Sequence, residues 1–319
     1  MSIHNEQWVG KVMTVQGLIP AEQVGITLPH EHLVVQGWDH QERNYYNSAY
    51  MELDKFVQAG GRTLVDVSSI GRVRDPRFFQ RLAERAGLQI IMGTGYYKDG
   101  WLPSAVHAMS VEAMADTIIR EIVEGVGDTG ICAGIIGEVG VSRMITPTEA
   151  KSLAAAARAQ RATGAGISLH LDIGSTISEH GHALDILAQN GADLTRVAVG
   201  HLVARPDNLE LCQHLAGRGC FVEFDLFGQE HWYLMNEMLR THPEVQISSI
   251  KGFVDSGLLE HILLSQNVGH LELMTVNGGE GYVHLLKNVV PRIKSYGVTA
   301  AEIETIMVGN PQRLLAFNA

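Results

Sequence analysis

Two histidines separated by one residue, in His30-Glu31-His32, lie within a stretch of apolar residues. Side chains two positions apart on an extended strand point the same way, so both imidazoles can reach one ion. Neighbours such as Leu28 and Leu33 predict a buried strand, and burying two imidazoles without polar partners is unfavourable. The pair therefore favours a metal site over two histidines that share a strand by chance.

Later apolar stretches carry more groups of related chemistry at or near their carboxyl ends, namely Glu138, His170, His201 and Asn267. Together with the histidine pair they provide four imidazoles and one carboxylate, a ligand set that suits zinc or a similar divalent metal. Glu138 on its own is a weak signal, since it could instead serve a structural ion pair. Beside four histidines we interpret it as a bridging ligand of two metal ions, which can share one hydroxide and lower its pKa.

These residues converge only if their segments belong to one sheet or barrel. Along the whole chain, short β-branched apolar runs alternate with longer helical stretches. Eight such runs occur, over residues 24–33, 63–68, 89–94, 133–140, 166–172, 196–202, 221–227 and 261–267. Helical patterns lie between them, over residues 76–86, 111–124, 148–163, 181–190, 209–216 and 281–294.

This alternation predicts an α/β fold, a (β/α)8 TIM barrel, and a single domain over residues 1–319, because no linker or change of composition divides the chain. A doubly wound sheet is the weaker alternative, since no Gly-x-Gly-x-x-Gly fingerprint follows an early strand. Residues 1–23 form an extension with a short predicted β-hairpin that closes the amino-terminal end of the barrel. Catalytic groups of such barrels lie at the carboxyl ends of the strands, where the candidate ligands are placed.

Composition narrows the class of partner. The chain has 319 residues, 45% of them hydrophobic, and a formal net charge of -11. The absence of a lysine- and arginine-rich cluster argues against nucleic acid or an anionic membrane surface. The three cysteines include no Cys-x-x-Cys pair, so neither a disulfide framework nor a thiolate zinc site is indicated. With neither a spanning apolar run nor a secretion signal, we expect a cytoplasmic protein with a small-molecule substrate, and a homodimer stays open.

The order of the candidate ligands resembles that of the amidohydrolase superfamily, and segment 25–32 looks like the signature of its phosphotriesterase family. Segments 93–97, 133–138, 199–201, 276–279 and 309–311 also have family counterparts in the same order. The resemblance implies two divalent metal ions, with Zn2+ expected first and Mn2+, Co2+ or Fe2+ as alternatives.

The same resemblance implies a role for each ligand. It places His30 and His32 on a buried ion, His170 and His201 on a more exposed ion, and Glu138 between the two. Many relatives have a carboxylated lysine at this bridge, whereas the branch of phosphotriesterase homology proteins has a glutamate. This sequence is similar to that branch.

The chain departs from the family pattern at Asn267. Relatives carry an aspartate there, which binds the buried ion and accepts the proton of the attacking hydroxide. The amide of Asn267 can offer an oxygen to a metal, but it has no negative charge and cannot act as a base near neutral pH. The departure predicts impaired catalysis or marks an engineered change.

Residues with candidate roles around the mouth are, in chain order, Arg72, Arg74, Tyr96, Tyr97 and Asp225. We favour solvated loop charges for both arginines, with substrate binding by Arg72 as the alternative. The two tyrosines follow the third strand and border the mouth, where they either bind substrate or pack at the rim. Asp225 follows the seventh strand and either orients His201 or caps a loop.

Two hypotheses of different class remain. We favour a binuclear metal-dependent hydrolase whose metal-bridging hydroxide attacks a small-molecule lactone or ester, with a phosphoester or an amide as further candidates. The preference for a lactone or ester depends on the two tyrosines, since the fold alone cannot select the scissile bond. The alternative is a catalytically silent protein that keeps the barrel and binds a small molecule.

Overall fold

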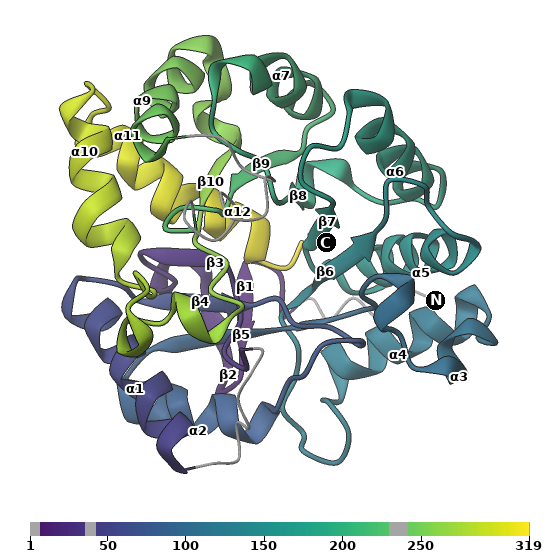
Figure 1. Ribbon diagram of the computed structural model, residues 1–319. Coiled ribbons are helices and arrows are strands. Elements are labelled where there is room, and N and C mark those ends of the chain that lie inside the picture. Colours follow the sequence, from purple (N-terminus) through teal and green to yellow (C-terminus); the bar gives the residue numbers. More distant parts are fainter. Residues whose placement is uncertain (1–6, 36–42, 230–241, 319) are drawn as a thin grey trace.

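The computed structural model of the protein describes residues 7–35, 43–229 and 242–318. Eight parallel strands surround a common axis, with helices around their outer side (Figure 1). The strands are β3 (Thr27–Glu31), β4 (Thr63–Asp66), β5 (Gln89–Thr94), β6 (Ile135–Val141), β7 (Ile167–Leu171), β8 (Val197–Val199), β9 (Phe221–Phe224) and β10 (Ile262–Leu264). Each overlaps one of the predicted runs, so the predicted TIM barrel is confirmed.

The helices follow the strands along the chain. They are α1 (Arg43–Gln58), α2 (Pro76–Ala86), α3 (Ser104–His107), α4 (Val111–Val123), α5 (Pro147–Thr163), α6 (Ile177–Gln189), α7 (Leu209–Gly217), α9 (Pro243–Phe253), α10 (Val290–Ser295), α11 (Ala300–Glu304) and α12 (Asn310–Leu315). The six predicted helical stretches overlap α2, α4, α5, α6, α7 and α10, whereas α1, α3, α9, α11 and α12 were not predicted. Within the described ranges, no helix is long and apolar enough to cross a membrane.

Helix caps fix the lengths of two loops at the mouth of the barrel. At α2, the Asp75 carboxylate accepts a hydrogen bond from the backbone N–H of Phe78, and Pro76 occupies the first turn. At α5, Thr146 and Glu149 form a reciprocal capping box. The loops that lead from β4 to α2 and from β6 to α5 therefore end at defined positions, which fixes the residues that they carry at the mouth.

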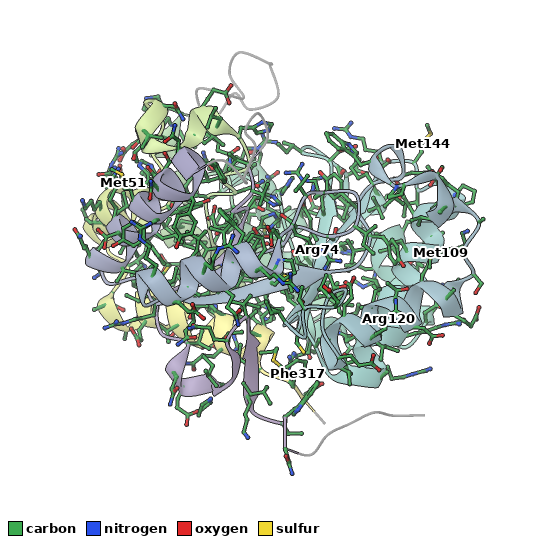
Figure 2. The ribbon with its side chains drawn as sticks, turned by 90° about the horizontal axis from the view of Figure 1, so that it is seen from below. Met51, Arg74, Met109, Arg120, Met144 and Phe317 are labelled. Atoms are coloured by element: carbon green, nitrogen blue, oxygen red, sulfur yellow. The ribbon has the colours of Figure 1, made fainter. Side chains whose placement is uncertain are left out.

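A β-hairpin lies at the amino-terminal end of the barrel, as predicted. Its strands β1 (Lys11–Thr14) and β2 (Gly17–Pro20) are antiparallel, and Val15 donates a backbone hydrogen bond to the carbonyl of Ile90 at 2.8 Å. Val12 is buried in a cluster of apolar side chains that includes Val65, Ile91 and Leu263 from three barrel strands. Seen at right angles to Figure 1, the hairpin lies at the same end as Phe317, and Met144 lies on the opposite side (Figure 2). The hairpin and the carboxyl-terminal segment therefore cover one end, and the mouth is at the other.

Side chains close the barrel between β3 and β10. The Ser265 hydroxyl accepts a hydrogen bond from His30 N at 3.1 Å and donates one to His30 O at 3.0 Å. The buried carboxylate of Glu31 accepts hydrogen bonds from the backbone N–H groups of Gln266 at 2.9 Å and Val268 at 2.7 Å. Glu31, the residue between the two histidines, thus fixes the loop that carries Asn267.

Candidate metal and substrate site

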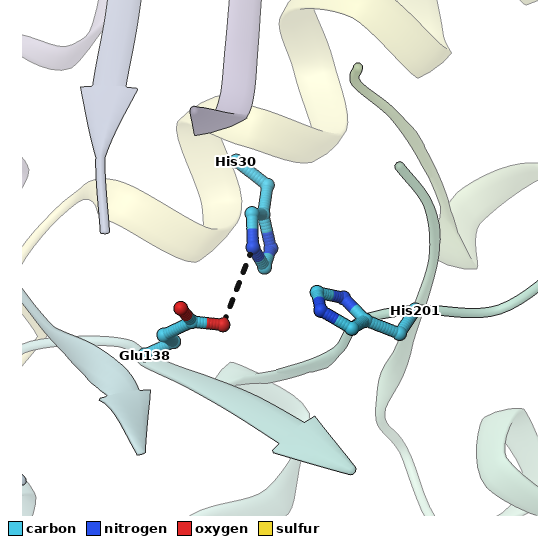
Figure 3. Close-up of side chains that lie close together, drawn as sticks. All are labelled: His30, Glu138 and His201. Atoms are coloured by element: carbon cyan, nitrogen blue, oxygen red, sulfur yellow. Dashed lines mark ion pairs between the residues drawn. The ribbon is translucent and has the colours of Figure 1, made fainter. Parts of the chain in front are cut away.

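The predicted metal ligands meet at the carboxyl end of the barrel. His30 on β3, Glu138 on β6 and His201 after β8 each place one ligand atom within 4.8 Å of the others, and their side chains point toward one another (Figure 3). Glu138 is central: its Oε2 lies 3.5 Å from His30 Nε2 and 2.7 Å from His170 Nδ1, and its Oε1 lies 3.5 Å from His32 Nε2. A carboxylate in this place can contact ligands of two metal positions.

Two of these residues lie beyond the strands on which they were expected. β8 ends at Val199 and β10 at Leu264, so His201 and Asn267 belong to the loops that follow. Their φ angles are 61° and 49°, in the left-handed region that non-glycine residues rarely adopt. Asn267 is held by a backbone hydrogen bond from its N to His30 O at 3.1 Å. These loop conformations turn both side chains toward the other ligands, and the Asn267 amide N lies 3.5 Å from His201 Nε2.

Three of the four histidines have an acid or hydroxyl partner at the ring nitrogen that faces away from the cluster. His30 Nδ1 lies 2.9 Å from Glu223 Oε2, and His32 Nδ1 lies 2.9 Å from Ser68 Oγ. Asp225 Oδ2 lies 2.9 Å from His201 Nδ1, and the same carboxylate accepts the His201 backbone N–H. Such partners fix the tautomer and the orientation of metal-binding histidines. The contacts agree with the interpretation that Asp225 orients His201.

Electrostatics around the cluster suit a cation. Burial lowers the pKa of His32 well below its ordinary value, with Arg72 as a further cause, and burial together with His201 lowers the pKa of His170 to about 4. The pKa of Glu138 lies well below its usual range despite burial, because the surrounding histidines, His170 first, stabilise its charge. Neutral imidazoles and an ionised carboxylate are the forms that bind a divalent metal.

His30 differs from the other histidines. Burial lowers its pKa, but the carboxylates of Asp225, Glu223 and Glu138 outweigh this and raise the pKa well above its ordinary value. His30 Nε2 is fully buried and makes no hydrogen bond within the described residues. The acids around His30 therefore stabilise a positive charge beside it. Because His30 Nε2 also has no hydrogen-bond partner among the described residues, this group of side chains fits a metal ion.

A pocket of 510 Å³ opens above the cluster. The predicted residues that line it are His32, Arg72, Tyr97, Glu138, His170, His201 and Asn267. The guanidinium of Arg72 lies 5.3 Å from the centre of the Tyr97 ring and 5.8 Å from that of Trp101. Arg72 is half-buried and forms part of the pocket wall, and its role in substrate binding stays a prediction.

Further lining residues were not predicted: Lys98, Trp101, Arg143, Asp172, Ile173, Gln229, Gly269 and His270. Lys98 Nζ lies 2.5 Å from Asp172 Oδ1, and Arg143 donates a hydrogen bond to Ile173 O at 2.9 Å. Lys98 and Arg143 follow β5 and β6 within four residues of the strand ends. That closeness to a strand end was the signal in the sequence that could have identified them.

Two predictions for this region are wrong. Tyr96 does not line the pocket: it is buried in the core outside the strands, with its hydroxyl 3.9 Å from Met109 Sδ. Consecutive side chains of an extended segment point in opposite directions, so only Tyr97 faces inward. Arg74 is not a solvated charge at the mouth, because its side chain donates to Gly93 O at 2.8 Å and to Glu121 at 2.7 Å.

Comparison with known proteins places this geometry in a family. The model of the phosphotriesterase family matches residues 10–315. The chain belongs to the phosphotriesterase family. The resemblance noted in the sequence is thereby confirmed.

Members of the phosphotriesterase family with full-length similarity include two N-acetyltaurine hydrolases. The protein from Dictyostelium discoideum is 32% identical over 97% of this chain and 98% of its own length. The protein from Homo sapiens is 32% identical with the same coverage. These names support a hydrolase.

Two solved structures share the phosphotriesterase-family barrel. A resiniferatoxin-binding protein from Rhodobacter sphaeroides has a TM-score of 0.89 and 32% identity over 96% of this chain and 95% of its own. The phosphotriesterase homology protein from Escherichia coli, complexed with phosphate in its active site, has a TM-score of 0.82 and 29% identity over 92% and 99%. The second agrees with the branch that the glutamate at position 138 indicated.

Proposed function

We propose that this member of the phosphotriesterase family is a metal-dependent hydrolase that cleaves a small anionic N-acyl amide. The N-acetyltaurine hydrolases are named for an acetamide that carries a sulfonate. Arg72 carries the proposal, because no carboxylate of the described residues lies within ion-pair distance of its guanidinium. An anionic group of the substrate would be that partner, since guanidinium binds carboxylate and sulfonate oxygens well.

Arg72 lies beside the ligand cluster. A Cβ placed on Gly269 would lie 3.1 Å from His32 Cδ2, 3.5 Å from Arg72 Nη2 and 3.6 Å from Asn267 Oδ1. Gly269 therefore leaves room where a ligand histidine, the amide and the guanidinium meet. An anion held by Arg72 would leave the rest of a short substrate directly over the ligands, which is the placement that hydrolysis needs.

We assign two divalent metal ions, with Zn2+ expected first, to the buried ligands: His30, His32 and Asn267 for one ion, His170 and His201 for the other, and Glu138 for both. When bound, such ions polarise a substrate carbonyl and lower the pKa of water. Asp225 and Ser68 hold His201 and His32 in the required orientations.

Neither of the two candidate acceptors among the described residues suits the proton of the attacking water. Asn267 cannot accept it near neutral pH. Asp225, the alternative acid, is fully buried, does not line the pocket and already accepts hydrogen bonds from His201. We therefore propose a slow hydrolase, either by nature or because Asn267 is an engineered change.

A lactone or ester remains a second substrate class with weaker support. The preference for it depended on two tyrosines, and only Tyr97 lines the pocket. A cytoplasmic location, a small-molecule partner in place of nucleic acid or membrane, and a homodimer also remain proposals.

The alternative function is binding without catalysis. Asn267 favours it, because general-base assistance is absent. The structural similarity to a protein described as resiniferatoxin-binding also favours it. Under this alternative the pocket would retain a small molecule and release it unchanged.

A hydrolysis screen on protein loaded with Zn2+ tests these functions. We expect release of the amine from N-acetyltaurine and from N-acetylated amino acids, and much slower release from amides of the same length that lack the anionic group. Equal rates on charged and neutral amides would contradict the role of Arg72. Binding without any turnover, in this protein and in an Asn267→Asp variant alike, would establish the binding function instead.

A further inference from the structure

Two buried carboxylates approach the same nitrogen of His30. Glu223 Oε2 lies 2.9 Å and Asp225 Oδ2 lies 3.1 Å from His30 Nδ1. That nitrogen has one proton to donate. Asp225 has other partners, since it accepts the backbone and ring N–H groups of His201. The only hydrogen-bond partner of the Glu223 side chain among the described residues is His30, and its Oε1 is buried with none.

Neither the fold nor substrate binding explains Glu223. Its side chain is 1% exposed and does not line the pocket, so it cannot contact a substrate. No lysine or arginine of the described residues forms an ion pair with it. An uncompensated buried charge costs several kcal/mol. Burial, with Asp225 as a further cause, raises the pKa of Glu223, so its negative charge is stable only beside a positive charge. Among the described residues, His30 is the one hydrogen-bond partner through which that charge can act.

The opposite side of that ring faces the ligand cluster. His30 Nε2 has no hydrogen bond and lies 3.5 Å from Glu138 Oε2. With Nδ1 donating its proton to Glu223, Nε2 is the nitrogen with a free lone pair. A carboxylate on the remote nitrogen fixes this tautomer and makes the ligand nitrogen more basic.

The charges around the buried ion are otherwise incomplete. Glu138 brings one negative charge, and Asn267 contributes an amide oxygen without charge. We propose that Glu223 is a positioning residue for His30 that supplies, through the imidazole, the negative charge that Asn267 does not bring to the buried metal ion. This inference depends on the metal binding of the proposed function, and it assigns Glu223 no contact with the substrate.

Stepwise Zn2+ titration against a chelating dye tests the proposal. Glu223→Gln keeps the size and an acceptor oxygen but removes the charge, and we expect about 10- to 100-fold weaker binding in one of two steps. That step should differ from the one weakened by His170→Ala. Glu223→Asp keeps the charge and should lose less. Circular dichroism checks that each variant folds. If Glu223→Gln does not fold, the Zn2+ titration of Glu223→Asp tests the proposal in its place.

Glu52→Gln is the matched control. Glu52 is also a buried glutamate with an oxygen that lacks a hydrogen bond, but it lies on α1 and its partners are Lys55 and Thr275. We expect both Zn2+ affinities to stay within about threefold of the parent, because this carboxylate touches no ligand. A loss as large as that of Glu223→Gln would show a general effect of removing buried charge and would overturn the proposal.

The decisive comparison is made in an Asn267→Asp background. There the buried ion gains a direct negative charge, so we expect Glu223→Gln to cost less than about threefold, a non-additive result of the kind that shared partners produce. The same loss in both backgrounds would mean that Glu223 only orients His30. The proposal that Glu223 compensates for the missing charge at Asn267 would then be wrong. No loss in the parent background would mean that Glu223 carries no charge there. A parent that binds no Zn2+ at all would overturn the proposed function itself.

Discussion

The floor and the rim of the pocket carry opposite charges. The floor consists of the proposed metal ligands His30, His32 and Glu138, with Glu223 and Asp225 behind them, and every one of these side chains is at most 2% exposed. Carboxylates outnumber cations there, which raises the pKa of His30 and stabilises positive charge.

The rim is cationic and more exposed. Arg72, Lys98 and Arg143 line it together with the rings of Tyr97 and Trp101. The acidic floor stabilises a cation, and the basic rim stabilises an anion. The contrast indicates a division of roles: the floor would determine metal content and turnover, and the rim would determine which substrates bind.

The largest effect is expected on the floor, at Glu138. Glu138→Gln should weaken both Zn2+ steps and lower hydrolysis by more than about 100-fold, because loss of an outer partner of a ligand alone costs about 10- to 100-fold and this carboxylate contacts three ligand histidines. Elemental analysis and titration measure the metal content. His170→Ala is the comparison and should mainly affect one step. Equal, independent losses in both variants would show that Glu138 does not bridge.

Asn267→Asp should produce the next largest effect, in the opposite direction. General-base assistance is worth about 10²- to 10⁴-fold in rate, so we expect turnover of the best substrate to rise at least about tenfold with a smaller change in its binding. Both proteins must be fully loaded with Zn2+, because the new carboxylate would also tighten metal binding. A metal-loaded variant that is no faster would show that position 267 does not hold the missing base.

The convergence of the proposed metal ligands on the barrel strands could be predicted because the strands determine it. The barrel brings the carboxyl ends of β3, β6 and β7 together. His30, Glu138 and His170 lie on these strands, so their convergence does not depend on the conformation of the loops. Helix α1 was also recognisable in principle, because its buried residues Tyr45, Ala49, Leu53 and Phe56 recur at intervals of three or four.

The rim and the support of His30 could not be predicted in the same way. Loop conformation places Arg72, and the direction of one side chain separates Tyr96 from Tyr97. Glu223 reads in the sequence as an ordinary strand residue, and only the distance to His30 reveals its role. Side chains far apart in sequence meet through tertiary packing, which periodicity does not encode.

At the rim, Arg72→Leu should raise the KM for an anionic amide by about tenfold or more, since a charge-assisted hydrogen bond contributes roughly 1.5–3 kcal/mol. We expect kcat to change little, because the guanidinium touches the remote part of the substrate. Arg77→Leu is the control, since Arg77 is an exposed arginine on α2 that pairs with Asp128. An equal rise in KM for a neutral amide of the same length would show a general disturbance of the pocket.

The two adjacent tyrosines provide the smallest and most specific test of the rim. Tyr97 supports the Arg72 guanidinium and lies edge-on to His170, with 5.1 Å between the ring centres. Tyr97→Leu removes a cation–π contact worth about 1 kcal/mol, so we expect KM for an anionic substrate to rise roughly fivefold. Tyr96→Phe removes a hydroxyl in the core that contacts Met109 Sδ and Thr117, so KM should not change, although thermal unfolding should shift slightly. Because these residues are neighbours, a general effect on β5 or its loop would appear in both variants. A rise in KM for Tyr96→Phe as large as that for Tyr97→Leu would therefore mean that the two side chains do not point to opposite sides. Tyr96 would then belong to the rim of the pocket.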